Sequence, residues 1–168
     1  MRIHVITACT RPRNLPALAE SIVDAACEGW EVCWHVLFDL ERAHVGGQRP
    51  KNHALDAIAD GWVCFLDDDT LMHPLLIETV SVHHSADAVV VSQERADGRT
   101  LVAARENVKV GRIDIGQAVI RRDVIGDERI PETYVGDGIF LENVLTADRP
   151  VMFVREVLSY HNALAVAA

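Results

Sequence analysis

Long basic runs and long apolar stretches are both missing from this chain of 168 residues. Its 16 Lys and Arg residues are scattered and are outnumbered by 25 Asp and Glu residues, which leaves a formal charge of −9. Because such a chain repels a polyanion, we expect no nucleic-acid polymer among its partners. No apolar run approaches the roughly 18 residues of a membrane span, so we expect no transmembrane segment.

Signals for export and for disulfide bonding are also lacking. The start of the chain passes directly into a strand-like segment, residues 2–8, without the basic and apolar regions of a signal peptide. The four cysteines form no CxxC pair and lie in segments with the character of a core. Reduced thiols in a cytoplasmic protein are the simplest account of that pattern. No repeat, low-complexity segment or linker is present.

The composition that remains, 49% hydrophobic and 24% charged, is that of one folded domain over residues 1–168. Strand-like and helix-like segments alternate in the first half, and the second half is less regular. The predicted strands are 2–8, 31–38, 62–66, 88–92, 117–121 and 151–157, and the predicted helices are 15–26, one from about 50, 74–84 and 137–147. This alternation predicts a three-layer α/β sandwich with a mostly parallel central sheet, whose ligands bind beyond the carboxyl ends of the strands.

Three consecutive aspartates, Asp67, Asp68 and Asp69, directly follow the third predicted strand. Like charges in a partly desolvated site raise one another's pKa, so some other group must offset their repulsion. In extended geometry Asp67 and Asp69 point the same way, which lets both reach one Mn²⁺ or Mg²⁺ ion. The alternative is a solvated acidic turn that caps the next helix.

Four short motifs carry a family resemblance. Residues 64–70 (CFLDDDT) resemble the DxD segment of GT-A glycosyltransferases, particularly the inverting family-two group. Residues 10–12 (TRP) are similar to that family's first nucleotide loop, 51–55 (KNHAL) to its basic helix start, and 134–138 (YVGDG) to the segment with its catalytic carboxylate. The motifs occur in family order over nearly the whole chain. The resemblance implies a Rossmann-like GT-A domain that transfers a sugar from a nucleotide-diphosphate sugar to an acceptor hydroxyl, with inversion.

The resemblance also implies roles for particular residues. Asp39, after the second strand, matches the carboxylate that recognises the nucleotide base, and cationic residues pair with the diphosphate. The implied donor-binding residues are Thr7, Arg11, Asp39, Lys51, Asp67 and Asp68. The implied ligands of Mn²⁺ or Mg²⁺ are Asp67, Asp69 and His161. The alternatives are an exposed loop acid at Asp39 and a histidine without a ligand at His161.

Asp137 is the candidate general base, which takes a proton from the acceptor hydroxyl. Its alternative role is to cap the helix that begins there. The family often has Glu-Asp where this chain has Gly136 and Asp137, and Glu142 one turn later is a reserve candidate. Asp114 and Gln117 lie where related enzymes contact the donor sugar or the acceptor.

Three other functions compete with glycosyl transfer. A haloacid-dehalogenase-like phosphatase also has DxD after a strand, but its motif continues with Thr or Val where this chain has Leu71. A metal-dependent nucleotidyltransferase shares the metal, nucleotide and sheet, but residues 8–15 lack its usual glycine-rich loop. The third is a nucleotide-sugar-binding module without turnover. In each case the acceptor is unknown, and a second copy of the chain is a possible partner.

Overall fold

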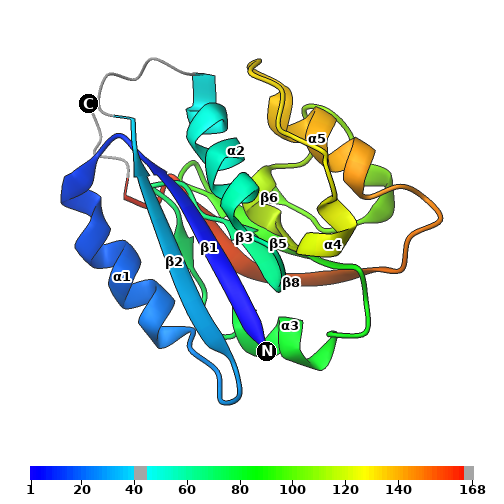
Figure 1. Ribbon diagram of the computed structural model, residues 1–168, viewed down its shortest axis with the longest axis horizontal. Coiled ribbons are helices and arrows are strands. Elements are labelled where there is room, and N and C mark those ends of the chain that lie inside the picture. Colours follow the sequence, from blue (N-terminus) through cyan, green and yellow to red (C-terminus); the bar gives the residue numbers. More distant parts are fainter. Residues whose placement is uncertain (40–44, 165–168) are drawn as a thin grey trace.

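The computed structural model describes residues 1–39 and 45–164, which form one mixed β-sheet and the helices around it (Figure 1). The strand order is β2-β1-β3-β7-β5-β8-β4, with β6 paired to β5. The strands are β1 (Arg2–Cys9), β2 (Glu31–Phe38), β3 (Trp62–Phe65), β4 (Leu71–Met72), β5 (Ala88–Arg95), β6 (Thr100–Leu101), β7 (Ala118–Arg121) and β8 (Val151–His161). The helices are α1 (Leu15–Asp24), α2 (Gln48–Ala57), α3 (Leu76–Val82), α4 (Arg122–Ile125) and α5 (Gly136–Val144), and short 3₁₀ turns include η2 (Val45–Gly47) and η4 (Ile115–Gln117).

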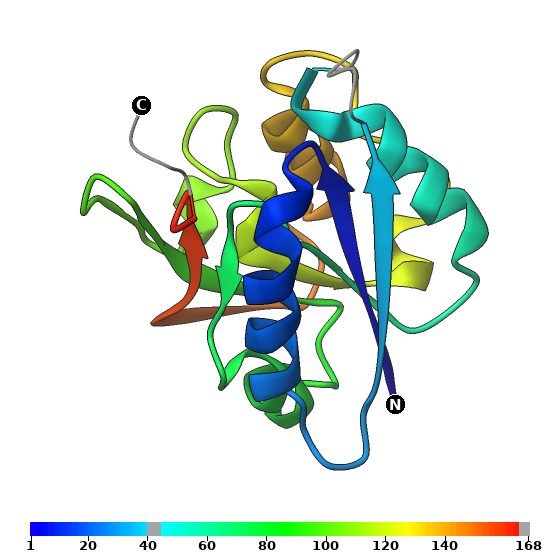
Figure 2. The same cartoon turned by 90° about the vertical axis from the view of Figure 1, so that its left-hand side faces the viewer.

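Helices cover both faces of the sheet, which confirms the predicted three-layer α/β fold. Alternate residues of the central strands belong to two separate cores, as the two-residue period of a strand requires. On β3, Val63 and Phe65 pack with α2 and α5, whereas Trp62 and Cys64 pack with α1 and α3. Figure 2 shows α1 and α2 on opposite sides of β1 and β2. Burial on both faces explains why the central strand β3 is wholly apolar.

The sheet is mixed, which refines the expected mostly parallel arrangement. β1 is parallel to β2 and β3, and β5 is parallel to β8, but β7 lies antiparallel between β3 and β5. β7, Ala118–Arg121, begins with three apolar residues, which predict a buried strand. An apolar run carries no information about strand direction, so the sequence alone could not predict this reversal.

The last strand is longer than the sequence predicts. β8 continues to His161, and its end pairs with β5 on one side and with the two-residue strand β4 on the other, with Leu71 opposite Tyr160. β4 lies just after the three aspartates. This pairing therefore brings His161 from the end of the chain to the aspartate loop.

The helices are short, and α1 and α2 have 10 residues each. Within residues 1–39 and 45–164, no helix is both long enough and apolar enough to cross a membrane. All four cysteines are free thiols, in agreement with the sequence pattern.

Arg122 ties the end of α2 to α4, and its loss is expected to destabilise the fold. Its Nε donates to the carbonyl oxygen of Ile58 at 2.8 Å. Its Nη1 and Nη2 donate to the carbonyl oxygens of Gly126 at 2.7 Å and Leu55 at 3.3 Å. The last carbonyl groups of a helix lack partners within it. We expect Arg122→Ala to lower the free energy of unfolding by about 2 kcal/mol, measured by urea denaturation.

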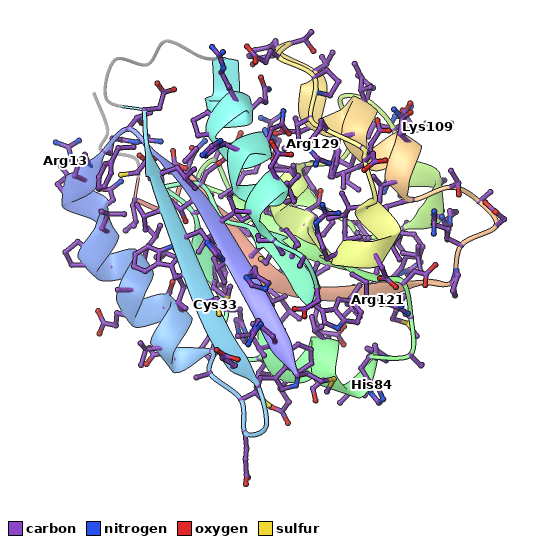
Figure 3. All side chains as sticks on the ribbon, viewed as in Figure 1. Arg13, Cys33, His84, Lys109, Arg121 and Arg129 are labelled. Atoms are coloured by element: carbon purple, nitrogen blue, oxygen red, sulfur yellow. The ribbon has the colours of Figure 1, made fainter. Side chains whose placement is uncertain are left out.

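Arg121 is the matched control for that variant. It lies on the surface (Figure 3), where its guanidinium pairs with Asp123 and, at 3.7 Å, with Asp87. Exposed ion pairs contribute about 0–1 kcal/mol, so Arg121→Ala is expected to cost less than Arg122→Ala. Equal losses for the two variants would contradict a capping role for Arg122.

Candidate functional site

The three aspartates begin where β3 ends, at the carboxyl edge of the parallel strands β1, β2 and β3. A cavity of about 350 Å³ lies at this edge. Its lining residues are Ala8, Thr10, Arg11, Gly46, Gly47, Asp67, Asp68, Asp69 and His161. A larger hollow of about 620 Å³ lies at the opposite end, around Arg2 and Trp62. It contains none of the predicted site residues, and ligands of such sheets bind at the carboxyl ends, so we assign the site to the smaller cavity.

Asp68 holds the first loop against the aspartate loop. Its Oδ2 accepts from the backbone nitrogens of Thr10 at 2.6 Å and Arg11 at 2.5 Å and from the Thr10 hydroxyl at 3.1 Å, and its Oδ1 accepts from Arg11 Nε at 2.9 Å and Nη2 at 2.6 Å. Burial opposes ionisation, but these donors hold the pKa of Asp68 below its usual value. Asp68, one of the expected donor contacts, thus binds the first loop through both of its carboxylate oxygens.

Asp69 is paired with the same arginine. Arg11 Nη2 lies 2.7 Å from Asp69 Oδ2, so one guanidinium bridges two neighbouring carboxylates. Asp69 is only 5% exposed. Burial raises its pKa above the usual range although Arg11 and His161 oppose that rise. Arg11, the expected diphosphate contact, is therefore paired with the aspartate loop in this structure.

Lys51, in the first turn of α2, is completely buried. Its Nζ lies 2.8 Å from Asp67 Oδ1 and donates to the Gly46 carbonyl oxygen at 3.1 Å. Burial opposes its charge, but Asp67 and then Asp137 outweigh that effect and raise the pKa of Lys51. Gly47 permits this approach of α2 to β1, because a Cβ there would lie 2.4 Å from that of Ala8 and its φ is +67°. Lys51 therefore lies behind Asp67 as a buried positive charge.

Asp137 lies in the first turn of α5, as predicted, and its environment favours the protonated form. Burial raises the pKa of Asp137 to about 6; Lys51 opposes the rise, and the charges of Asp67 and Asp114 add to it. Its Oδ1 is buried, and no residue of the described segments gives it a hydrogen bond. A buried carboxylate oxygen without a donor is costly, so Asp137 is suited to accept a proton from a ligand.

The surroundings of Gly136 and Glu142 explain the departure from the family pattern and distinguish Asp137 from the reserve candidate. A Cβ at Gly136 would lie 2.0 Å from the Pro131 carbonyl oxygen, so the glutamate that often precedes the base cannot fit here. Glu142, the reserve candidate, accepts a hydrogen bond from the backbone nitrogen of Val110 at 2.5 Å on the surface. Asp137 is therefore the better placed of the two carboxylates.

His161 and Asp114 meet beside the aspartates. His161 Nδ1 lies 4.0 Å from Asp114 Oδ2, is buried, and has no hydrogen-bond partner in the described part of the chain. Asp114 caps η4 by accepting from Gly116 N at 2.9 Å, and it also accepts from Gln93 at 3.2 Å and Arg95 at 3.5 Å. Gln93 and Arg95 were not predicted as site residues, because the sequence predicted that this strand ends at residue 92, whereas β5 continues to Arg95.

The fold of the chain matches those of known transferases at low sequence identity. Over 96% of its length it superimposes on residues 1–349 of S. aureus TarS with a TM-score of 0.74 and 17% identity, and covers 60% of that protein. The same TarS fragment in complex with UDP-GlcNAc gives a TM-score of 0.72 at 15% identity, with 99% of the chain and 61% of the fragment covered. The chain has a GT-A-like fold.

Two other GT-A-like neighbours are nearly as short as this chain. The inositol-1-phosphate CTP transferase of T. maritima has a TM-score of 0.58 at 12% identity, over 95% of the chain and 88% of that protein. Rv0371C of M. tuberculosis H37Rv, in complex with manganese, has a TM-score of 0.52 at 14% identity, over 99% and 92%. The chain thus spans about 60% of the TarS fragment but most of these two proteins. No protein-family profile and no curated protein matches its sequence.

Two of the expected donor contacts lie outside the aspartate cavity. Thr7 is fully buried and accepts a hydrogen bond from Trp34 Nε1 at 3.0 Å, so it stabilises the pairing of β1 with β2. Asp39 follows β2 directly, and its backbone nitrogen donates to the Cys9 carbonyl oxygen at 2.9 Å. Asp39 lines a separate cavity of about 310 Å³ that includes Phe38 and His53.

The expected metal ligands share one cavity of this GT-A-like fold without forming a ready metal site. In residues 1–39 and 45–164, no three His, Cys, Asp or Glu side chains are grouped so that they could hold an ion. The donor types nevertheless fit Mn²⁺ or Mg²⁺, because Asp67, Asp69 and His161 line the same cavity and His161 Nδ1 has no partner among the described residues. One oxygen of Asp69, Oδ2, is already paired with Arg11 Nη2 at 2.7 Å.

Proposed function

We propose that the chain is a metal-dependent glycosyltransferase that transfers a sugar from a nucleotide-diphosphate sugar to an acceptor hydroxyl, with inversion. Asp137 carries this proposal. It is a buried carboxylate with a raised pKa and a free acceptor oxygen, within electrostatic reach of Lys51, Asp67 and His161. Such a group is suited to general-base catalysis near neutral pH.

In the proposed reaction, Asp137 accepts the proton of the acceptor hydroxyl while that oxygen attacks the anomeric carbon. The bond from that carbon to the diphosphate oxygen breaks on the opposite face, so the anomeric configuration inverts. Lys51 holds Asp67 in place and contributes positive charge beneath the diphosphate. Asp69 and His161 would hold a divalent cation, which would supply further positive charge for the leaving diphosphate.

A nucleotide sugar is the proposed donor because the TarS neighbour has been crystallised with UDP-GlcNAc. The cavity beside Asp39 is the proposed place for the base, and the aspartate cavity is the place for the diphosphate. Both cavities lie near the start of α2: Arg49 of that helix lines one, and Gly46, two residues before the helix, lines the other. The sugar then extends toward Asp114 and Asp137.

A nucleotidyltransferase is the second candidate. The T. maritima CTP transferase supports it, since the present chain covers 88% of that protein. That reaction breaks a different bond: the substrate oxygen attacks the α-phosphorus of a nucleoside triphosphate and pyrophosphate leaves. Nucleotidyl transfer has no evident role for a buried base such as Asp137. The glycosyl transfer proposed above requires one.

We expect the protein, with Mn²⁺, to release a nucleoside diphosphate slowly from one member of a panel of nucleotide sugars, even without an acceptor. Chromatography of the nucleotide products measures this directly. Release of pyrophosphate from a nucleoside triphosphate would instead favour the second candidate. Tight metal-dependent binding of a nucleotide sugar without any turnover would indicate a binding module.

A further inference from the structure

Arg11 occupies a position that a bound cation would share. Its Nη2 lies 2.6 Å from Asp68 Oδ1 and 2.7 Å from Asp69 Oδ2, and its Nε donates to Asp68 Oδ1 at 2.9 Å. The guanidinium lines the aspartate cavity, and its side chain is 30% exposed. Asp69 is the carboxylate to which we assign the metal ion, so one of its oxygens already binds a positive group of the protein.

We infer that Arg11 is the resident counter-ion of Asp69: its guanidinium holds that carboxylate in the metal-free protein and turns from it to the donor diphosphate when a divalent cation binds. The inference rests on the metal site of the proposed function, but not on the transfer reaction. It makes Arg11 a positioning residue that couples binding of the metal to binding of the nucleotide.

The need for a counter-ion follows from the charges around Asp69. Asp67 and Asp68 are adjacent in the chain, and Lys51 contacts only Asp67 among these three carboxylates. Asp69 is almost completely buried, and an unpaired buried carboxylate is costly. Arg11 therefore stabilises the metal-free site, and for the same reason it competes with any ion that binds Asp69.

The geometry allows Arg11 to release Asp69 without undoing the loop. The backbone nitrogen of Arg11, together with Thr10, remains hydrogen-bonded to Asp68, and so does Arg11 Nε. The contacts that have to break are those of Nη2, with Asp69 Oδ2 and with Asp68 Oδ1. A guanidinium freed on one side and facing the cavity can then pair with phosphate oxygens, which it binds in bidentate fashion.

Titration of Mn²⁺ alone, followed by electron paramagnetic resonance of the free ion, tests the competition. We expect Arg11→Gln to bind Mn²⁺ about tenfold more tightly than the wild type, which corresponds to about 1.4 kcal/mol. Arg11→Lys cannot reach Asp68 and Asp69 together, so a smaller gain of about threefold is expected for it. Asp69→Asn should lose Mn²⁺ binding in every background.

Arg13 supplies a matched control. The substitution Arg13→Gln removes the same charge two residues away. The Arg13 side chain, however, lies on the outer surface at the start of α1 (Figure 3). Arg13→Gln should bind Mn²⁺ as the wild type does. A general electrostatic effect would instead tighten binding equally in the Arg13 and Arg11 variants, and that result would overturn the inference.

Adding UDP tests the coupling. In the wild type, UDP should tighten Mn²⁺ binding, and Mn²⁺ should tighten UDP binding by the same factor. In Arg11→Gln that factor should shrink, because no guanidinium is released. Mn²⁺ binding by both Arg11 variants that is equal to or weaker than that of the wild type would overturn the counter-ion role but not the metal site. If neither the wild type nor any variant bound Mn²⁺, with or without UDP, both the metal site and the counter-ion role would be overturned. Absence of sugar transfer, with the Mn²⁺ results as expected, would contradict only the proposed reaction.

Discussion

Asp137→Asn is expected to abolish sugar transfer while leaving nucleotide binding intact. Asparagine has nearly the shape of aspartate but cannot take a proton from the acceptor hydroxyl, so we expect the turnover rate to fall by about 10²–10⁴-fold. Release of nucleoside diphosphate in the presence of acceptor measures the rate, and calorimetric titration with UDP measures binding. Glu142→Gln is the control, because the Glu142 carboxylate contacts only a surface backbone nitrogen among the described residues and its loss should leave the rate unchanged.

The pH dependence gives the same prediction a second form. The base must be ionised, and burial raises the pKa of Asp137 to about 6, so the wild-type rate should fall as the pH falls through about 6. The effect on stability has the opposite sign. Because the folded-state pKa lies above the unfolded value, folding favours the protonated form, and stability is lost as the pH rises through about 6. Above that pH, Asp137→Asn should therefore melt at a higher temperature than the wild type; a lower melting temperature would mean that the Asp137 carboxylate stabilises the fold.

Lys51→Met is expected to cause the largest loss of stability. Lys51 is fully buried against Asp67, and removal of one partner of a buried ion pair costs about 3–5 kcal/mol. Asp67 is partly exposed, so we expect the lower end of that range. Methionine keeps the length and the apolar stem of lysine, which confines the change to the charge. Urea denaturation at pH 7.5 measures the loss.

Lys109 and Asp67 supply the controls for this loss. Lys109, the chain's only other lysine, is exposed on the surface (Figure 3), and Lys109→Met should change the free energy of unfolding by less than about 0.5 kcal/mol. Combining Lys51→Met with Asp67→Asn removes both charges of the pair and should recover part of the stability. If the double variant were less stable than Lys51→Met alone, the ion pair with Asp67 would not explain the effect.

Much of the first half of the fold could be predicted from the sequence. The strand Glu31–Phe38 has the predicted bounds. The aspartates follow β3 as expected, because β3 is buried on both faces and its sequence is a continuous apolar run. The start of α2 differs by two residues from the expected position near Pro50. Local patterns of hydrophobicity and turn residues carry this information.

The rest of the site depends on contacts between residues far apart in the sequence. Asp68 and Arg11 are 57 residues apart, and no local pattern indicates that an aspartate of a DxD run spends its hydrogen bonds on a distant loop. Gln93 and Arg95 join Asp114 only because β5 and η4 meet in the fold. The family resemblance therefore predicted the aspartates and Asp137 as site residues. The residues that pair with them could be identified only from the structure.

The position of β7 ties the folding of the sheet to the assembly of the site. Because β7 lies between β3 and β5, neither strand can complete its hydrogen bonds until residues 118–121 are in place, more than 50 residues after β3. Such long closures slow folding, and until then both strands present bare edges that invite pairing with other chains. The turn η4, with Asp114, directly precedes β7 and arrives with it. During synthesis, the middle of the sheet and this wall of the site therefore form in a single late step.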